Sequence, residues 1–158
     1  MIKINNILQN TTFLNHMEEI TKAEEQRIFC NHQIDHLLDV ARIMYINNLE
    51  STLNINKEII YATALLHDIG RGTAYKKGTD HAIESANIAK DILQECGFNR
   101  EETKNILFAI THHNDNIKGH ALCTLLRKAD KASRNCFMCS AFEECNWSDE
   151  KKNKRVTV

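Results

Sequence analysis

The chain contains no proline and only five glycines among its 158 residues. Both residue types disfavour helix interiors, so their scarcity favours an all-α fold. The sequence also lacks an uninterrupted apolar run of the roughly 20 residues that a membrane-spanning helix requires. Its first residues, MIKINNILQNTTFLNHMEE, are polar and contain no apolar signal core. We therefore expect a cytoplasmic protein that does not bind membranes.

The chain has no large excess of charge of either sign. It contains 20 lysines and arginines and 21 aspartates and glutamates, which give a formal net charge of −1. This balance gives no strong basic field, so we expect no long nucleic acid as a partner. Hydrophobic residues make up 42% and charged residues 26% of the chain, as in ordinary globular proteins. We expect a single domain over residues 1–158, and the composition leaves its oligomeric state open.

Helical periodicity recurs along the chain and predicts six or seven helices and no strand. The clearest helical segments are residues 17–29, 32–47, 57–68, 81–96, 101–113 and 119–132. The segment GRGTAYKKGTD, residues 70–80, predicts a loop that its glycines at 70, 72 and 78 would let move as a lid. Residues 135–150 are cysteine-rich, and we expect the charged residues 151–158 to be frayed.

Histidines and aspartates recur at helix ends and at polar positions within apolar helices. The set consists of His36, His67, Asp68, His81, His112, His113 and Asp130. Side chains from different helices of a bundle can meet in its interior to bind metal. Imidazole and carboxylate groups suit iron, manganese, zinc or magnesium better than a soft, thiophilic ion. A single histidine is more often a surface or hydrogen-bonded core residue, so the predicted metal site depends on the joint pattern.

The segment ALLHDIGRG, residues 64–72, places His67 directly beside Asp68 where a predicted helix ends. Adjacent side chains diverge by about 100° on a helix. His67 can therefore bind a metal from one side, while the two oxygens of Asp68 bridge to a second metal or hold an attacking water. A position at a helix end lets both side chains reach a cavity.

The order H…HD…H…HH…D resembles the HD superfamily of metal-dependent phosphohydrolases. The similarity covers residues 30–134, through the segments HLLDVA (36–41), ALLHDIGRG (64–72), DHAIESANIAKDIL (80–93) and ADKASR (129–134). In the third segment, Ser85 and Ala86 stand where members often carry Gly-Ala. The resemblance implies an HD-domain bundle of six to seven helices around a buried metal site that hydrolyses phosphoesters.

The resemblance also implies which residues bind metal. The ligands of a first ion would be His36, His67, Asp68 and Asp130. A second ion would be held by His81 with either His112 or His113, and Asp68 would bridge the two ions. The segment HHNDNIKGHAL lacks the Gly-Tyr-Pro signature of the cyclic-dinucleotide phosphodiesterase branch. The symmetrical dinucleoside tetraphosphatases share the small size and the motif order.

Two ions at such a site would activate a water that attacks phosphorus. Asp68 would orient this water, and an unligated His112 or His113 would protonate the leaving oxygen. Arg71 is suited to contact a phosphate through two hydrogen bonds. Further candidates for phosphate contacts are Lys76, Lys77, Lys131 and Arg134, although Lys76 and Lys77 fit a solvated surface at least as well. His32 lies four residues before His36 and fits an auxiliary ligand, a residue that contacts a ligand without binding the metal, or a capping or surface residue.

Six cysteines in a chain without a secretion signal predict reduced thiols or metal ligands rather than disulfides. Cys136, Cys139 and Cys145 form a C-x2-C-x5-C pattern, and C-x2-C is a common chelating unit for zinc or an iron–sulfur cluster. Cys30 is the candidate for a fourth ligand, because it directly precedes the helix of His36. The alternative is a set of small buried side chains with reactive thiols.

The sequence thus predicts a metal-dependent phosphohydrolase with two divalent ions and a small phosphorylated substrate, most simply a nucleotide. The alternative is a non-catalytic HD-like domain that senses a nucleotide or a redox state through its cysteines. The complete set of seven ligand-type residues favours the enzyme. The substrate and the metal are not specified by the sequence.

Overall fold

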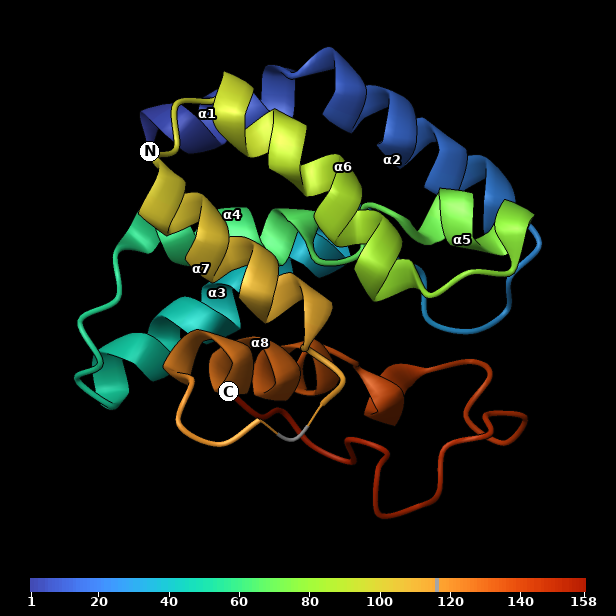
Figure 1. Ribbon diagram of the computed structural model, residues 1–158. Helices are drawn as coiled ribbons and strands as arrows, with labels where there is room; N and C mark the ends of the chain where they lie inside the picture. The colour runs from blue at the N-terminus through green and yellow to red at the C-terminus, as the bar shows by residue number, and fades with distance from the viewer. Residues whose placement is uncertain (116) are drawn as a thin grey trace.

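The computed structural model describes residues 1–115 and 117–158, and these contain eight α-helices, one short 3-10 helix and no strand (Figure 1). The helices are α1 (Ile2–Gln9), α2 (Thr11–Ala23), α3 (Ile34–Glu50), α4 (Lys57–Leu66), α5 (Arg71–Lys77), α6 (His81–Glu95), α7 (Arg100–Thr111), α8 (Ala121–Ala132) and η1 (Cys136–Met138). The prediction of an all-α fold is confirmed. No helix in the described part of the chain combines the length and the apolar character that crossing a bilayer requires.

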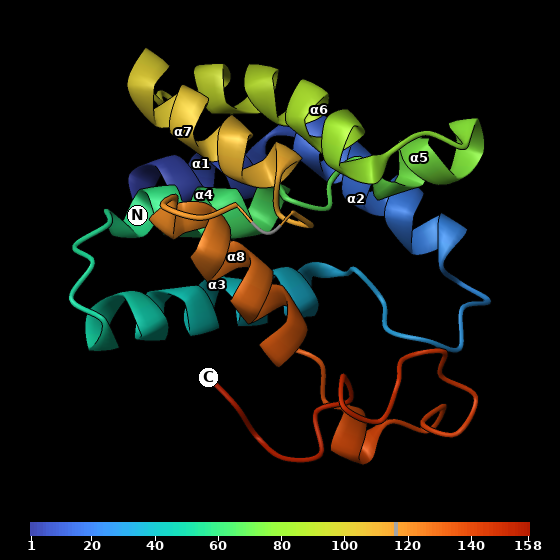
Figure 2. The ribbon, with the colours of Figure 1, turned by 60° about the horizontal axis from the view of Figure 1, so that its bottom comes forward.

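The central helix of the bundle is α4, with neighbours on several sides (Figures 1 and 2). Its sequence, KEIIYATALL, is almost wholly apolar, and six of its ten residues are buried. Leu65 and Leu66 pack into a core shared with α1, α6 and α7, whereas Ile60 and Ala64 pack into a second core with α3 and α8. Burying each large aliphatic side chain stabilises the fold by about 1.5–3 kcal/mol. The end of α4 is therefore held firmly in the middle of the molecule.

The segment over residues 70–80 is not the predicted loop, because residues Arg71–Lys77 form α5. This helix begins after Gly70 and ends at Gly78, which takes the left-handed conformation that glycine adopts without strain (φ 68°). The side of α5 that carries Gly72 and Ala74 is buried, and α5 packs on both α2 and α6. This packing favours a helix in a segment whose three glycines and short length predict a loop.

Two irregular segments lie beside each other at one end of the bundle, residues 24–33 after α2 and residues 133–158 after α8 (Figures 1 and 2). The Arg134 guanidinium joins them by donating to the Asn31 carbonyl oxygen at 3.2 Å. Within the segment expected to fray, Lys152 donates to the Phe142 carbonyl oxygen at 2.8 Å, and Asn153 donates to the Lys131 carbonyl oxygen at 2.6 Å. Residues 152 and 153 are therefore tied to the body of the protein.

Candidate metal centre

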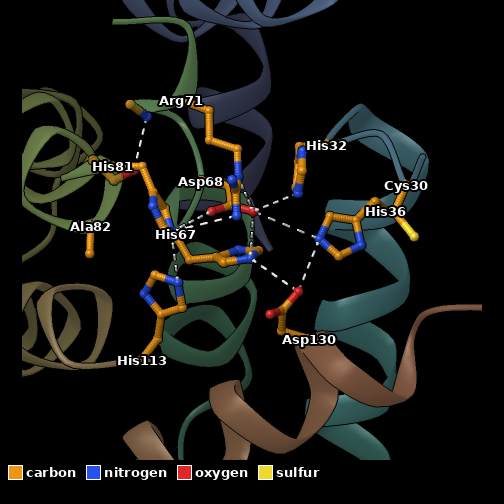
Figure 3. Close-up of polar contacts among 12 residues, drawn as sticks. Cys30, His32, His36, His67, Asp68, Arg71, His81, Ala82, His113 and Asp130 are labelled. Carbon is orange, nitrogen blue, oxygen red and sulfur yellow. Dashed lines mark hydrogen bonds and ion pairs between the residues drawn. The ribbon is translucent and has the colours of Figure 1, made fainter. Parts of the chain in front are cut away.

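Six of the seven predicted ligands meet beside the end of α4 (Figure 3). They come from five parts of the chain. His36 lies on α3, His67 and Asp68 follow α4, His81 begins α6, His113 follows α7, and Asp130 lies on α8. Their ligand atoms form two groups, and within each group all atoms lie within 4.8 Å of one another. The bundle thus brings together imidazoles and carboxylates that the sequence places up to a hundred residues apart.

The turn that carries His67 and Asp68 approaches α6 unusually closely at Gly70. A Cβ atom on Gly70 would lie 2.3 Å from the Ser85 nitrogen and 2.6 Å from the Glu84 carbonyl carbon, which no side chain tolerates. The Gly70 nitrogen instead donates to the Ser85 hydroxyl at 2.9 Å. Glycine and serine at these two positions therefore fix the distance between the His67–Asp68 turn and the start of α6, where His81 lies.

The first group of ligand atoms consists of His36, His67, Asp68 and Asp130. The Nε2 atom of His67 lies 3.2 Å from Oδ2 of Asp68 and 3.9 Å from Oδ1 of Asp130. The Nε2 atom of His36 lies 3.4 Å from the same Asp130 oxygen and 4.0 Å from the same Asp68 oxygen. Two imidazoles and two carboxylates therefore face a common centre.

The second group consists of Asp68, His81 and His113. The Nε2 atoms of His81 and His113 lie 3.3 Å apart, and Nε2 of His81 lies 3.6 Å from Oδ1 of Asp68. Asp68 belongs to both groups and presents one oxygen to each, since Oδ2 faces the first group. This is the bridging position that the sequence predicts for it.

The two adjacent histidines after α7 have different surroundings. His113 is buried and points into the site, whereas His112 stacks on the Phe108 ring with 4.3 Å between ring centroids. The Nδ1 atom of His112 lies 2.9 Å from the Phe108 carbonyl oxygen. The structure thus places His113, and not His112, among the ligand-type residues.

Three of the four ligand-type imidazoles are held in place by a polar contact at their Nδ1 atom. Nδ1 of His67 lies 2.7 Å from the Ala64 carbonyl oxygen, and Nδ1 of His113 lies 2.7 Å from the Ile110 carbonyl oxygen. Nδ1 of His36 lies 3.2 Å from the Ser133 hydroxyl. These contacts leave Nε2 of each ring facing the centre, and metal-binding histidines are commonly held in this way.

A family model for the HD domain matches residues 34–136, which contain all of these ligand-type residues. The chain belongs to the HD domain family. A protein of Clostridium beijerinckii described as uncharacterized is 45% identical over 156 residues, which cover 99% of both chains. No solved structure matched the chain.

Two partial relatives carry a functional name. A bifunctional uridylyltransferase/uridylyl-removing enzyme of Cereibacter sphaeroides is 32% identical over 82 residues, which cover 52% of this chain and 8% of the relative. One of Nitrobacter hamburgensis with the same name is 36% identical over 58 residues, which cover 37% of this chain and 6% of the relative. The matched stretch is thus less than a tenth of either relative.

The unsatisfied polar atoms of the HD site fit a metal ion. His67 Nε2 and both oxygens of Asp68 are buried and make no hydrogen bond within the protein. A buried polar atom without a partner costs about 1–3 kcal/mol. Divalent ions of the kind that imidazole and carboxylate ligands bind would satisfy all three atoms at once. The ligand-type residues of this chain therefore fit the metal that the HD family implies.

The negative charges of the two carboxylates in the site also favour a bound cation. Burial alone would lower the pKa of His67, but the carboxylates of Asp68 and Asp130 outweigh it and raise this pKa to about 10. Burial disfavours an ionised Asp68, but His67 and Arg71 hold its pKa well below the usual range. The two carboxylates thus stay ionised and attract positive charge to the centre of the site.

His32 and Glu24 form a buried pair behind the HD site. Nδ1 of His32 lies 2.5 Å from Oε1 of Glu24, and Tyr75 donates to the same oxygen at 2.8 Å. Nε2 of His32 lies 3.8 Å from Oδ2 of Asp68. His32 is only 3% exposed, so it is not the surface residue that the sequence allows. Glu24 was not predicted as part of the site, because nothing in the irregular segment 24–33 marks it.

The candidate phosphate-binding cations fall into two classes. Arg71 places Nε 2.9 Å from Oδ2 of Asp68, and Arg134 places a guanidinium nitrogen 3.2 Å from Oδ1 of Asp130. By contrast, Lys76 and Lys77 are exposed on α5 and lie near the carboxylates of Glu19 and Glu84. The two arginines and Lys131 line a cavity beside the site, while Lys76 and Lys77 do not.

This cavity has a volume of ≈450 Å³ and opens between the HD site and the two irregular segments. His32 and Asp130 line it from the metal side, and Trp147 lines it from the C-terminal segment. Its other lining residues include the four cysteines of the predicted second metal site, which are Cys30, Cys136, Cys139 and Cys145. All six cysteines are free thiols. In the described part of the chain, no three cysteine sulfurs lie within 4.8 Å of one another.

Proposed function

We propose that this protein is a phosphohydrolase that uses two divalent ions, bound at the two groups of ligand atoms, to hydrolyse a phosphoester of a small molecule. The observation that carries the proposal is the position of Asp68. It is shared between the two groups, and one of its two oxygens lies near each group. A carboxylate placed in this way is suited to bridging two ions.

The ligand assignment that we propose follows the two groups. The first ion would be held by His36, His67, Asp68 and Asp130, and the second by Asp68, His81 and His113. Bound divalent ions of this kind lower the pKa of a water molecule and stabilise charge on phosphoryl oxygens. Because His112 stacks outside the site, we assign it no role in the reaction.

Two groups of this chain are suited to the proton transfers. Asp68 orients the attacking water through its oxygens. His32 accepts a proton at Nε2, because Glu24 holds the proton on Nδ1 and Nε2 faces Oδ2 of Asp68 at 3.8 Å. Burial is the main cause that lowers the pKa of His32, so this ring is available as a neutral base. We assign no residue the role of protonating the leaving oxygen, which the sequence predicts for an unligated His112 or His113.

The substrate that we propose is small and anionic. The cavity has a volume typical of small-molecule sites, and Asp130 is the sole acidic residue among its described lining residues, against five lysines and arginines. Arg71 and Arg134 are suited to phosphate oxygens through paired hydrogen bonds. The names of the partial relatives include removal of a uridylyl group, a phosphate-linked nucleotide, and this supports a nucleotide as the phosphorylated substrate.

The test is turnover of a generic phosphodiester and of a panel of nucleotides by protein loaded with manganese or iron. We expect Asp68→Asn to lower the rate at least roughly a hundredfold, because the several kcal/mol that the ions contribute to the transition state are lost. Asp39→Asn removes a carboxylate of the same size from the exposed side of α3 and should keep the parent rate.

Circular dichroism of both variants would show whether the helices are intact. Parent-like turnover by a folded Asp68→Asn protein contradicts the proposed mechanism. A parent protein that binds two ions but hydrolyses no compound of the panel would instead favour the non-catalytic sensor.

A further inference from the structure

Four of the six cysteines gather on one side of the cavity beside the HD site. Cys30 comes from the segment between α2 and α3, and Cys136, Cys139 and Cys145 come from the segment after α8. The Cys30 sulfur points away from the His67–Asp68 pair (Figure 3), and neither group of HD ligand atoms includes a cysteine. The remaining two cysteines are buried in the helical cores.

The other three thiols lie close enough to Cys30 to affect its charge. Burial is the main cause that raises the pKa of the Cys30 thiol, and Arg134 opposes it. The thiols of Cys136, Cys139 and Cys145 each raise it further. Cys30, which lies far from the other three in the sequence, thus belongs to the same group in space.

The segment that carries three of these thiols has little apolar contact to hold it in place. Apart from η1 it is irregular, and the hydrophobic residues that it buries after residue 134 are Cys136 and Ala141. Phe137 is 41% exposed and Met138 is 81% exposed. Ordering one residue of backbone costs about 1–2 kcal/mol. Ligation of several cysteines to one metal group would supply the missing stabilisation, because metal binding couples directly to folding.

The spacing of the sulfurs distinguishes two kinds of thiolate site. A zinc ion with Zn–S bonds of about 2.3 Å draws four sulfurs to within about 4 Å of one another. No three cysteine sulfurs in the described residues meet even a 4.8 Å limit, although the HD ligand atoms do. An iron–sulfur cluster holds its four thiolates farther apart, because irons and sulfides lie between them.

We propose that Cys30, Cys136, Cys139 and Cys145 ligate an iron–sulfur cluster that fastens the C-terminal segment to residues 24–33 at the rim of the HD site. Each thiol gives up its proton on ligation. The cluster ties together two segments that both line the cavity, so it fixes the wall opposite the HD ligands. Because Cys30 and His32 are close in the chain, the cluster also anchors the stretch that holds His32 against Glu24.

The test is acid-labile sulfide in full-length protein prepared without oxygen, together with iron content and visible absorption. Labile sulfide is specific for the cluster, since iron alone can also bind at the HD site. We expect the parent protein to contain labile sulfide and a broad visible absorption, and the double variant Cys136→Ser/Cys139→Ser to lose both. Cys96→Ala, in the core and outside the cavity, should keep them.

Two more variants test the cluster if the double variant does not fold, and distinguish it from the HD site. Cys145→Ser alone should lower the sulfide content even if the double variant does not fold. Asp68→Ala should lose HD metal but keep the sulfide, which separates this proposal from the proposed phosphohydrolase activity. The cluster is ruled out if the anaerobic parent contains no labile sulfide even after incubation with ferrous iron and sulfide. Zinc without sulfide, or equal sulfide in the parent and the folded double variant, would also overturn the assignment.

Discussion

Metal binding at the HD site should stabilise the folded protein by an amount that the structure allows us to work out. Three buried atoms, His67 Nε2 and the two oxygens of Asp68, lack hydrogen-bond partners. At about 1–3 kcal/mol each, they destabilise the metal-free protein by at most roughly 3–9 kcal/mol in total, since the ion pair of Asp68 Oδ2 with Arg71 Nε at 2.9 Å offsets part of this cost. Manganese at a hundred times its dissociation constant should stabilise the protein by about 2.7 kcal/mol through mass action, which lies just below the lower end of that range.

For a domain of about 150 residues this corresponds to a rise in Tm of roughly 5–11 °C. The measurement is differential scanning calorimetry of chelator-treated protein, with and without manganese. Manganese is chosen because it prefers oxygen and nitrogen ligands, so the thiols of the cavity compete little for it. We expect Asp68→Asn to lose most of the rise, because this substitution replaces one ligand oxygen with an amide nitrogen and removes the negative charge that both groups share.

The matched control is Asp39→Asn, which should show the same rise as the parent, since Asp39 lies on the exposed side of α3 beside Arg42. An equal rise in the parent and in Asp68→Asn would refute the assignment of Asp68 as a ligand. Failure of the parent to respond, with manganese shown to be bound by elemental analysis, would refute the argument from unsatisfied buried atoms.

Three further predictions test other parts of the structure. His113→Ala should remove the second metal ion and lower turnover roughly a hundredfold, whereas His112→Ala should keep both, as elemental analysis and rate measurements would show. Gly70→Ala should lower the free energy of unfolding by about 3 kcal/mol in a urea titration, because the added Cβ meets the backbone of α6; parent-like stability would contradict this contact. The pKa of Glu24 is lowered from 4.5 to about 2, because its hydrogen bonds and charge interaction with His32 outweigh burial. Ionised Glu24 therefore stabilises the fold fully above about pH 4.5, by about 3 kcal/mol, and this contribution is lost as the pH falls towards 2. The difference in unfolding free energy between the parent and Glu24→Gln should shrink over that window, and a constant difference would contradict the role of the charge.

The order of motifs predicts six of the residues whose ligand atoms the structure brings together. Helical periodicity predicts where each helix lies, and ligands at helix ends keep their place even when a predicted boundary is wrong by two residues. Asp68 illustrates this, because α4 ends at Leu66 rather than at Asp68, yet its carboxylate still lies at the centre of the site. The same reasoning could not predict α5, because a short segment with three glycines forms a helix there through its contacts with α2 and α6.

The sequence by itself determined the all-helical class, the HD family and the candidate ligands, because each of these follows from residue types at fixed spacings along one chain. Tertiary structure decided between His112 and His113, since adjacent side chains at a helix end point in different directions and packing selects which one faces inward. It also decided that Glu24 supports His32 and that Cys30 joins three distant thiols at one cavity. These contacts are made by irregular segments, whose path is set by what they pack against and not by any periodic pattern of their own.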